Sequence, residues 1–311
     1  MHFNGTIWRP PYEAGSLLLQ ATAGCTHHAC KFCTLYQDLP FRFRMSPLEE
    51  IEADLQEAQL WSTDPLCLLS ARLQGLPSAG RVRRVFLTGA NPFVLQAERL
   101  EAIAERIRTY FPSVESIGCF ARVTDVALKR DEDLLALHRL GYDGITIGAE
   151  TGDREALTFM NKGYSPHAIV EQASRLDQAG IGYSFFYLTG IAGADRGREA
   201  AEHSAAVFNQ THPQRIGASM LTVFPESPLY QDIQQGRWKE AGELEKLAEL
   251  KTLLECLTIE TRFETDGASN QIQIRGNLPR DRERLIASLD RWTAEADEKS
   301  LRRYRENLRH L

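Results

Sequence analysis

The feature that most constrains this chain of 311 residues is a regular alternation of short apolar runs with longer segments of helical spacing. We expect strands at 16–23, 82–87, 116–121, 145–147, 182–188 and 216–224. We expect helices that begin at Ser46-Pro47 and at Ser165-Pro166, and others over 96–111, 131–140 and 198–209. Strands that alternate with helices at this spacing predict parallel βαβ units. Six such units predict an α/β fold, a partial (β/α)6 TIM barrel.

The alternation stops beyond Pro225. Helical spacing then covers 227–235, 241–257 and 280–311, with strands expected at 259–263 and 271–275. We therefore predict a lead-in over 1–15, a partial barrel over 16–226 and a mainly helical extension over 227–311. Prolines and glycines interrupt the pattern over 61–81, which predicts a long inserted loop that folds over the site.

Composition bounds the function classes. A chain that is 43% hydrophobic can bury a sizeable core, and a net charge of −6 argues against a general nucleic-acid surface, which would have to be basic. Only the tail over 299–311 has a cationic bias. We expect its arginines to form the solvated face of a last helix rather than an RNA clamp: Arg302, Arg303, Arg305 and Arg309.

Three of the six cysteines fall within nine residues, at Cys25, Cys30 and Cys33. This C-x4-C-x2-C spacing places three sulfurs on one tight loop, directly after the first expected strand. Three thiolates can hold an iron-sulfur cube and leave one iron open. The alternative is a zinc knuckle that takes His27 or His28 as its fourth ligand.

The remaining cysteines are isolated from one another and from this loop, and we expect buried apolar thiols at Cys67, Cys119 and Cys256. No secretory signal precedes them and no apolar run is long enough to span a membrane, so we predict a reducing, cytoplasmic location.

The cysteine loop resembles that of the radical S-adenosylmethionine (SAM) enzymes. Phe32 fits the family's C-x-aromatic-C pattern, and Gly24 to Tyr36 is similar to a branch of the superfamily with the sequence G-C-T-H-N-x-C-x-F-C-x-M-Y. The family's usual spacing is C-x3-C-x2-C, and this branch has one more residue between the first two cysteines. The branch is largely without assigned substrates. The resemblance implies that Cys25, Cys30 and Cys33 bind a 4Fe-4S cluster, and that SAM chelates the open iron. One electron then splits SAM to a 5'-deoxyadenosyl radical.

The resemblance also implies residues that contact SAM near the amino acid end. Thr88, Gly89 and Asn91 form the turn where the family has a Gly-Gly-Glu-like loop that meets the SAM amino group, although an ordinary βα turn explains them too. Glu150 occupies the place of the Glu in Gly-Leu-Glu-Ser-Gly and would face the ribose or amino group. A salt bridge from Glu150 to Arg122 is the structural alternative, and Arg122 itself could neutralise the SAM carboxylate.

Other candidates are weaker. Lys162 could hold a carboxylate or simply be solvated. Ile191 lies in a Gly-Ile-Ala-Gly segment similar to the one that shapes the adenine pocket, and Val223 could close its other side, but both also suit a core. Asn270, in an Ala-Ser-Asn element, is a weak substrate-side candidate. Nothing in the sequence decides whether His27 and His28 tune the cluster.

The sequence thus predicts a radical SAM enzyme that acts on an unknown, small organic substrate, with an electron donor such as flavodoxin or ferredoxin. No catalytic residue is assigned. Modification of RNA or protein by the same chemistry is an alternative supported only by the Arg-rich tail, and a non-catalytic zinc module is another. The chain shows no second cysteine group for an auxiliary cluster.

Overall fold

A computed structural model describes residues 1–73 and 82–308 of the chain. Its contacts divide into two compact units, which are described separately. Unit 1 comprises 1–28, 35–145 and 179–181, and unit 2 comprises 29–34, 146–178 and 182–311. The boundaries of the three predicted domains stay a prediction.

Unit 1 is built on three parallel strands in the order β1-β4-β5. These are β1 (Leu17–Gln20), β4 (Arg84–Thr88) and β5 (Ser116–Ala121). Strands buried on both faces need continuous apolar runs, and Val85, Phe86 and Leu87 are fully buried. The expected strand over 16–23 instead breaks into β1 and β2 (Thr22–Gly24), because β2 turns away to pair antiparallel with β3 (Phe43–Met45).

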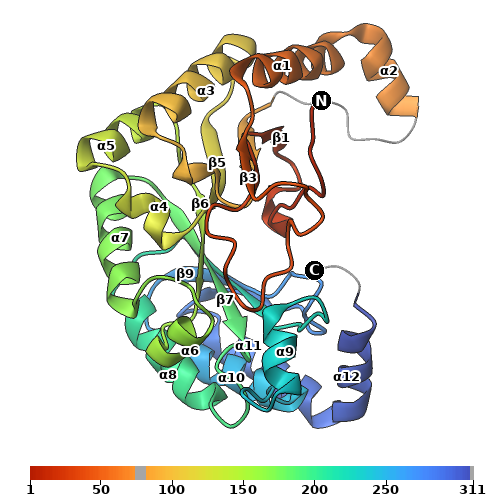
Figure 1. Cartoon of the computed structure of the whole chain (residues 1–311), viewed down its shortest axis with the longest axis vertical. Helices are drawn as coiled ribbons and strands as arrows, with labels where there is room; N and C mark the ends of the chain where they lie inside the picture. The colour runs from red at the N-terminus through yellow and green to blue at the C-terminus, as the bar shows by residue number, and fades with distance from the viewer. Residues whose placement is uncertain (74–81, 309–311) are drawn as a thin grey trace. The chain divides into compact units, whose positions relative to one another are not determined.

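Helices cover this sheet. α1 (Leu48–Thr63) packs against α3 (Ala97–Tyr110), and α3 packs against α5 (Asp131–Arg139), as Figure 1 shows. Each presents an apolar stripe at helical spacing, such as Leu100, Ile103 and Ile107 of α3. The shorter elements of the unit are η1 (Pro11–Glu13), η2 (Pro92–Val94) and α4 (Val123–Ala127).

The prediction of a long inserted loop over 61–81 is wrong for the first part of that range. α1 runs on to Thr63, and α2 (Pro65–Leu73) follows at once. Asp64 starts this helix because its Oδ1 accepts from the backbone N–H groups of Leu66 and Cys67, both at 2.9 Å, and Pro65 suits the first helical position. Residues 74–81 of the predicted loop lie outside the described residues.

Unit 2 continues the alternation with strands in the order β6-β7-β8-β9-β10. They are β6 (Ile145–Glu150), β7 (Tyr183–Thr189), β8 (Arg215–Met220), β9 (Thr261–Glu264) and β10 (Arg275–Leu278). β7, β8 and β9 are parallel, so β9 extends the parallel sheet beyond the six predicted units, whereas β10 pairs antiparallel with β9. β10 starts at Arg275, later than the expected strand over 271–275.

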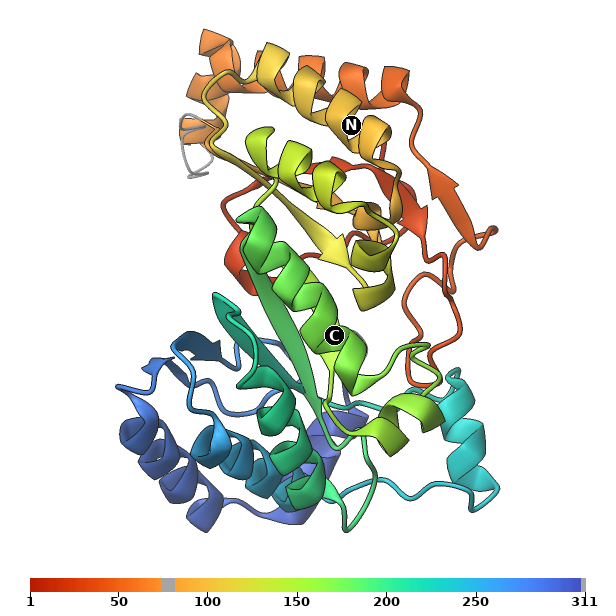
Figure 2. The ribbon, with the colours of Figure 1, turned by 90° about the vertical axis from the view of Figure 1, so that its left-hand side faces the viewer.

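The helices of unit 2 include those of the mainly helical C-terminal part. α10 (Glu243–Cys256) packs between α8 (Gly197–Phe208) and α11 (Arg282–Glu295), and Figure 2 shows the three side by side at the lower left. The others are α6 (Arg154–Phe159), α7 (Pro166–Ala179), α9 (Pro228–Gln234) and α12 (Glu298–Glu306). The single helix expected from 280 breaks because the Asp297 side chain accepts from the N–H of Ser300 and starts α12.

The solvated arginine face predicted for the tail is wrong for Arg305. Its side chain is buried and donates to both Glu243 oxygens at 2.8 Å, to Thr222 Oγ1 at 2.9 Å and to the carbonyl of Ser269 at 3.1 Å. A buried guanidinium with this many acceptors fixes α12 to the end of β8. Arg303 is exposed as expected, and Arg309 lies outside the described residues.

Candidate functional site

The first predicted metal ligand, Cys25, belongs to unit 1 and follows β2 directly. Its N–H donates to the carbonyl of Arg42 at 3.0 Å, and the Arg42 guanidinium returns a hydrogen bond to the carbonyl of Thr26 at 3.0 Å. Gly24 must be glycine, because its φ is +77° and a Cβ there would meet the Arg42 carbonyl oxygen at 2.2 Å. The backbone at Arg42 therefore packs directly against the start of the cysteine loop.

The other two predicted ligands, Cys30 and Cys33, belong to unit 2. The N–H of Cys33 donates to the carbonyl of Cys30 at 3.2 Å, which closes a turn. Lys31 anchors this turn: its N–H donates to the carbonyl of Met160 at 3.2 Å and its ammonium lies 2.8 Å from Asp232. Phe32 packs against an apolar cluster that includes Ile191. Backbone hydrogen bonds and the Lys31 ion pair therefore hold this segment in place.

The donor set fits an iron-sulfur cluster by kind and spacing. The three thiols are partly exposed and form no disulfide. Thiolates are the ligands that iron-sulfur clusters and zinc both prefer. Over residues 1–73 and 82–308, no group of three or more His, Cys, Asp or Glu side chains is arranged to hold a metal ion. This holds for the three cysteines with or without His27 or His28, so both the iron-sulfur cluster and the zinc alternative stay predictions from the sequence.

In unit 1, the turn after β4 is dictated by close packing. Gly89 has a φ of +127°, and a Cβ there would lie 2.1 Å from Thr22 Oγ1 and 2.4 Å from the Thr22 carbonyl oxygen. Thr88, just before it, is fully buried. Packing on Thr22 thus requires glycine at position 89 whether or not a ligand approaches.

Asn91 is buried and joins three segments of unit 1. Its amide nitrogen donates to Thr26 Oγ1 at 2.9 Å and to the Asp125 carboxylate at 3.1 and 3.2 Å. Asp125 also accepts from the N–H of Arg122 at 2.8 Å, and the Arg122 guanidinium donates to Thr124 Oγ1 at 2.9 Å. Burial raises the pKa of Asp125, while hydrogen bonds from Arg122 and Asn91 oppose the rise. Asn91 therefore ties the cysteine loop's first half to β4 and α4.

In unit 2, Glu150 at the end of β6 pairs with Lys162. Lys162 Nζ lies 3.1 Å from Glu150 Oε1, and Lys162 is only 4% exposed. Burial disfavours the ammonium, yet the charges of Glu150, Tyr164 and Cys30 outweigh it and raise the pKa of Lys162. Lys162 is thus buried rather than solvated, and its partner in the structure is the carboxylate of another candidate residue, Glu150.

Glu150 has a strained backbone, with a φ of +63°. Non-glycine residues in this left-handed region cost about 1–3 kcal/mol and gather at functional sites. The neighbouring Gly148 makes room for the carboxylate, because a Cβ at 148 would lie 2.6 Å from Glu150 Oε1. Tyr164 Oη donates to the carbonyl of Gly148 at 2.5 Å. The end of β6 therefore holds a partly buried charge in a fixed orientation.

Ile191 and Val223 belong to one apolar cluster in unit 2. Ile191 is fully buried, and Val223 and Phe32 are partly buried against the same cluster. This brings together the aromatic residue of the cysteine motif and both residues predicted beside adenine. Packing in the core explains these contacts as well as an adenine pocket does, and the sequence left both alternatives open.

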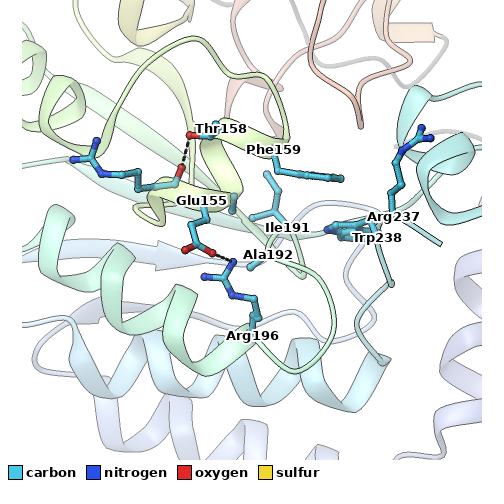
Figure 3. Close-up of a pocket in the computed structure, with 10 residues that line it drawn as sticks. Glu155, Thr158, Phe159, Ile191, Ala192, Arg196, Arg237 and Trp238 are labelled. Atoms are coloured by element: carbon cyan, nitrogen blue, oxygen red, sulfur yellow. Dashed lines mark hydrogen bonds and ion pairs between the residues drawn. The ribbon is translucent and has the colours of Figure 1, made fainter. Parts of the chain in front are cut away.

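Beside this cluster is a cavity of about 480 Å³, shown in Figure 3. Phe159, Ile191, Ala192 and Trp238 give it apolar walls, and charged side chains stand at its margin: Arg154, Glu155, Arg196 and Arg237. The Arg196 guanidinium pairs with Glu155 at 2.8 Å and with Asp153 at 3.3 Å. The ammonium of Lys31 lies 3.8 Å from the centre of the Phe159 ring, so the cavity adjoins the Cys30–Cys33 turn.

Asn270 is 5% exposed and serves the fold. Its amide donates to the carbonyl of Ala218 at 2.8 Å and to the carbonyl of Thr265 at 3.0 Å, and its N–H donates to the carbonyl of Gly267 at 3.0 Å. These bonds fix the loop after β9 against β8, which explains an asparagine here without a substrate.

A family model decides the relationship: residues 19–200 match the radical SAM superfamily. The chain belongs to that superfamily. The match covers more than half of this chain and includes all three cysteines of the motif as well as Glu150 and Lys162. A search of curated proteins gave no match.

Solved structures of radical SAM enzymes share the fold at low identity. TsrM from Kitasatospora setae, a radical SAM methyltransferase with cobalamin and a [4Fe-4S] cluster bound, is 16% identical with a TM-score of 0.53, over 71% of this chain and 37% of TsrM. Methylornithine synthase PylB is 15% identical with a TM-score of 0.52, over 93% of this chain and 85% of PylB. Coproporphyrinogen III oxidase HemN from Escherichia coli is 14% identical with a TM-score of 0.53, over 77% and 51%.

These likenesses confirm the predicted fold class, an α/β partial barrel with a mainly helical C-terminal part. The chain spans about 40% or less of TsrM, half of HemN and most of PylB. No described helix is long and apolar enough to cross a membrane.

Sequence reasoning missed three side chains that hold the candidate site. Asp125 and Lys31 were not singled out, and neither was Glu249, a buried carboxylate of α10 that reaches the loop after β7. A charged residue within the apolar stripe of a helix was the available signal, because Glu249 lies between the buried Leu247 and Leu250.

Proposed function

We propose that this protein is a radical SAM enzyme in which Cys25, Cys30 and Cys33 hold three irons of a 4Fe-4S cluster and SAM binds the fourth. The observation that carries the proposal is the C-x4-C-x2-C motif inside the matched region, with thiols that form no disulfide. When bound, the reduced cluster supplies one electron that cleaves SAM into methionine and a 5'-deoxyadenosyl radical, which abstracts hydrogen from a substrate.

The chain's own residues orient SAM and keep water away. Phe32, Ile191 and Val223 offer an apolar surface for adenine, and Glu150 offers an acceptor for a ribose hydroxyl or the amino group. The ion pair with Lys162 fixes the direction of the Glu150 side chain. In unit 1, Thr88, Gly89 and Asn91 present the turn that meets the SAM amino group, and Arg122 is the candidate for its carboxylate.

The substrate proposed is a small organic molecule, and the electron comes from a donor such as flavodoxin or ferredoxin in a reducing cytoplasm. Modification of RNA loses support in the tail, because Arg305 is buried against Glu243, and Arg302 pairs with Glu240 at 2.8 Å.

The test is anaerobic reconstitution with iron and sulfide, followed by dithionite and SAM. The wild-type protein should bind about four irons and release 5'-deoxyadenosine. Cys33→Ser should lose both, whereas Cys256→Ser, a matched change at a partly exposed cysteine outside the motif, should retain both. Stoichiometric zinc with no iron and no 5'-deoxyadenosine would support the zinc module instead.

A further inference from the structure

The C-terminal extension contributes a buried carboxylate to the segment predicted to face adenine. Glu249 of α10 is 1% exposed. Its Oε2 accepts from the N–H of Gly190 at 2.7 Å, and its Oε1 accepts from Tyr187 Oη at 2.6 Å. Gly190 directly follows β7 and precedes Ile191, so Glu249 binds the backbone immediately after the end of that strand.

The same helix contacts this segment a second time through Lys246. A Cβ on Gly190, whose φ is +80°, would lie 2.9 Å from Lys246 Cε, so the lysine stem packs directly on the glycine. Lys246 Nζ donates to the carbonyl of Leu221 at 3.0 Å, and the N–H of Leu221 donates to the carbonyl of Thr189 at 3.0 Å. α10 therefore fixes the ends of β7 and β8 together.

The loop over 190–194 is closed from its other side as well. The N–H of Gly193 donates to the carbonyl of Gly190 at 3.1 Å, and the N–H of Ala194 donates to the carbonyl of Lys239 at 2.9 Å. A Cβ on Gly193 would lie 2.9 Å from Trp238 Nε1. Within residues 1–73 and 82–308, the acceptor of the Gly190 N–H is Glu249 Oε2.

Burying a carboxylate at this point is costly for folding alone. An apolar side chain on α10 would pack more cheaply, except that the Gly190 N–H would then be buried without an acceptor. The Glu249 carboxylate thus has a defined task, which is to hold one backbone N–H in one direction.

We infer that Glu249 is a positioning residue, which sets the 190–193 loop so that Ile191 presents a fixed surface to the adenine of SAM. The inference rests on the proposed function and deepens it, because it assigns part of SAM recognition to the extension beyond the region matched by the family model.

The experiment compares Glu249→Leu, Glu249→Gln and Glu255→Leu, an exposed position on the same helix. Hydrogen exchange of the peptide spanning 189–194 is measured first in the cofactor-free protein. Glu249→Leu should speed this exchange about tenfold, while Glu249→Gln, which keeps an acceptor, and Glu255→Leu should match the wild type.

The second readout is SAM cleavage after reconstitution. Glu249→Leu should raise KM for SAM about tenfold and change kcat less than about threefold, because the loop binds SAM and takes no part in electron transfer. Unchanged exchange in Glu249→Leu, an unchanged KM, or equal damage in Glu249→Gln would overturn the inference. Failure of the wild-type protein to bind SAM would overturn the proposed function as well, so the two failures are told apart by the wild type.

Discussion

The candidate site residues of the two units differ in whether a role in folding accounts for them. In unit 1, Gly89 and Asn91 have complete structural roles, since one permits close packing on Thr22 and the other ties three segments together. In unit 2, Glu150 combines a strained φ with a buried ion pair to Lys162, and neither feature helps folding. The difference teaches that unit 2 carries the stronger structural sign of function.

The largest expected effect tests the structural role in unit 1. Gly89→Ala should destabilise the protein by about 3–5 kcal/mol, because a Cβ meets Thr22 at 2.1 Å and φ is unfavourable for alanine. Chemical denaturation measures the loss. Gly15→Ala is the control, since nothing lies within 4 Å of its added Cβ. A tolerated Gly89→Ala would mean that the turn is not held by packing, and the contrast between the units would disappear.

The ion pair of unit 2 is tested by a double-mutant cycle. Lys162→Met should cost about 3 kcal/mol of stability by leaving Glu150 without its partner, and adding Glu150→Gln should recover most of that loss. SAM binding should be lost in both variants. If stability recovers but SAM binding does not, the ion pair serves SAM binding rather than folding, which strengthens the contrast between the two units. A double variant that binds SAM normally would deny the pair a functional role.

The pH dependence of stability tests the buried carboxylate of α10. Burial raises the pKa of Glu249 from 4.5 to about 8, with Glu245 acting in the same direction, while Tyr187, the Gly190 N–H and Lys246 oppose it. The folded protein then keeps a proton that the unfolded chain loses near pH 4.5, so this group's contribution to stability falls as pH rises towards 8. Glu249→Gln should flatten that fall by about 2 kcal/mol in denaturation curves recorded from pH 5 to 8. Parallel wild-type and variant profiles would refute the assignment.

A smaller effect is expected at Asn91. Asn91→Ala removes donors to Thr26 and Asp125 and should cost about 1–2 kcal/mol, measured by thermal unfolding. Thr124→Ala, which removes an acceptor of the same α4 segment, is the matched control and should cost less. A loss of SAM binding in Asn91→Ala without a loss of stability would show that unit 1 also contacts SAM directly.

The sequence predicted the parts of this structure that depend on local pattern. The strand over 116–121 is placed exactly, and the helix after Ser46-Pro47 begins at Leu48, because apolar runs and caps are short-range signals. The helix after Asp64 was missed because Gly and Pro in the following residues obscured an Asp-Pro start. The family was predicted from the resemblance of the whole cysteine loop, Gly24 to Tyr36, to that of the radical SAM enzymes.

Partners distant in sequence could not be predicted. Lys162 was not proposed as a partner of Glu150, and the structure pairs the two, since the pairing depends on how the chain turns after β6. Arg305 was expected in solvent, and it pairs with Glu243, 62 residues away. Single-sequence patterns indicate which residues are costly to bury, but the fold decides what they meet.

The most direct test of the account is Mössbauer spectroscopy of the protein reconstituted with ⁵⁷Fe, recorded with and without SAM. Three thiolate ligands leave one iron of a 4Fe-4S cluster without a protein ligand, so SAM should shift the signal of one iron in four and leave the other three unchanged. A spectrum that SAM does not alter would contradict the account, as would a protein that binds zinc in place of iron.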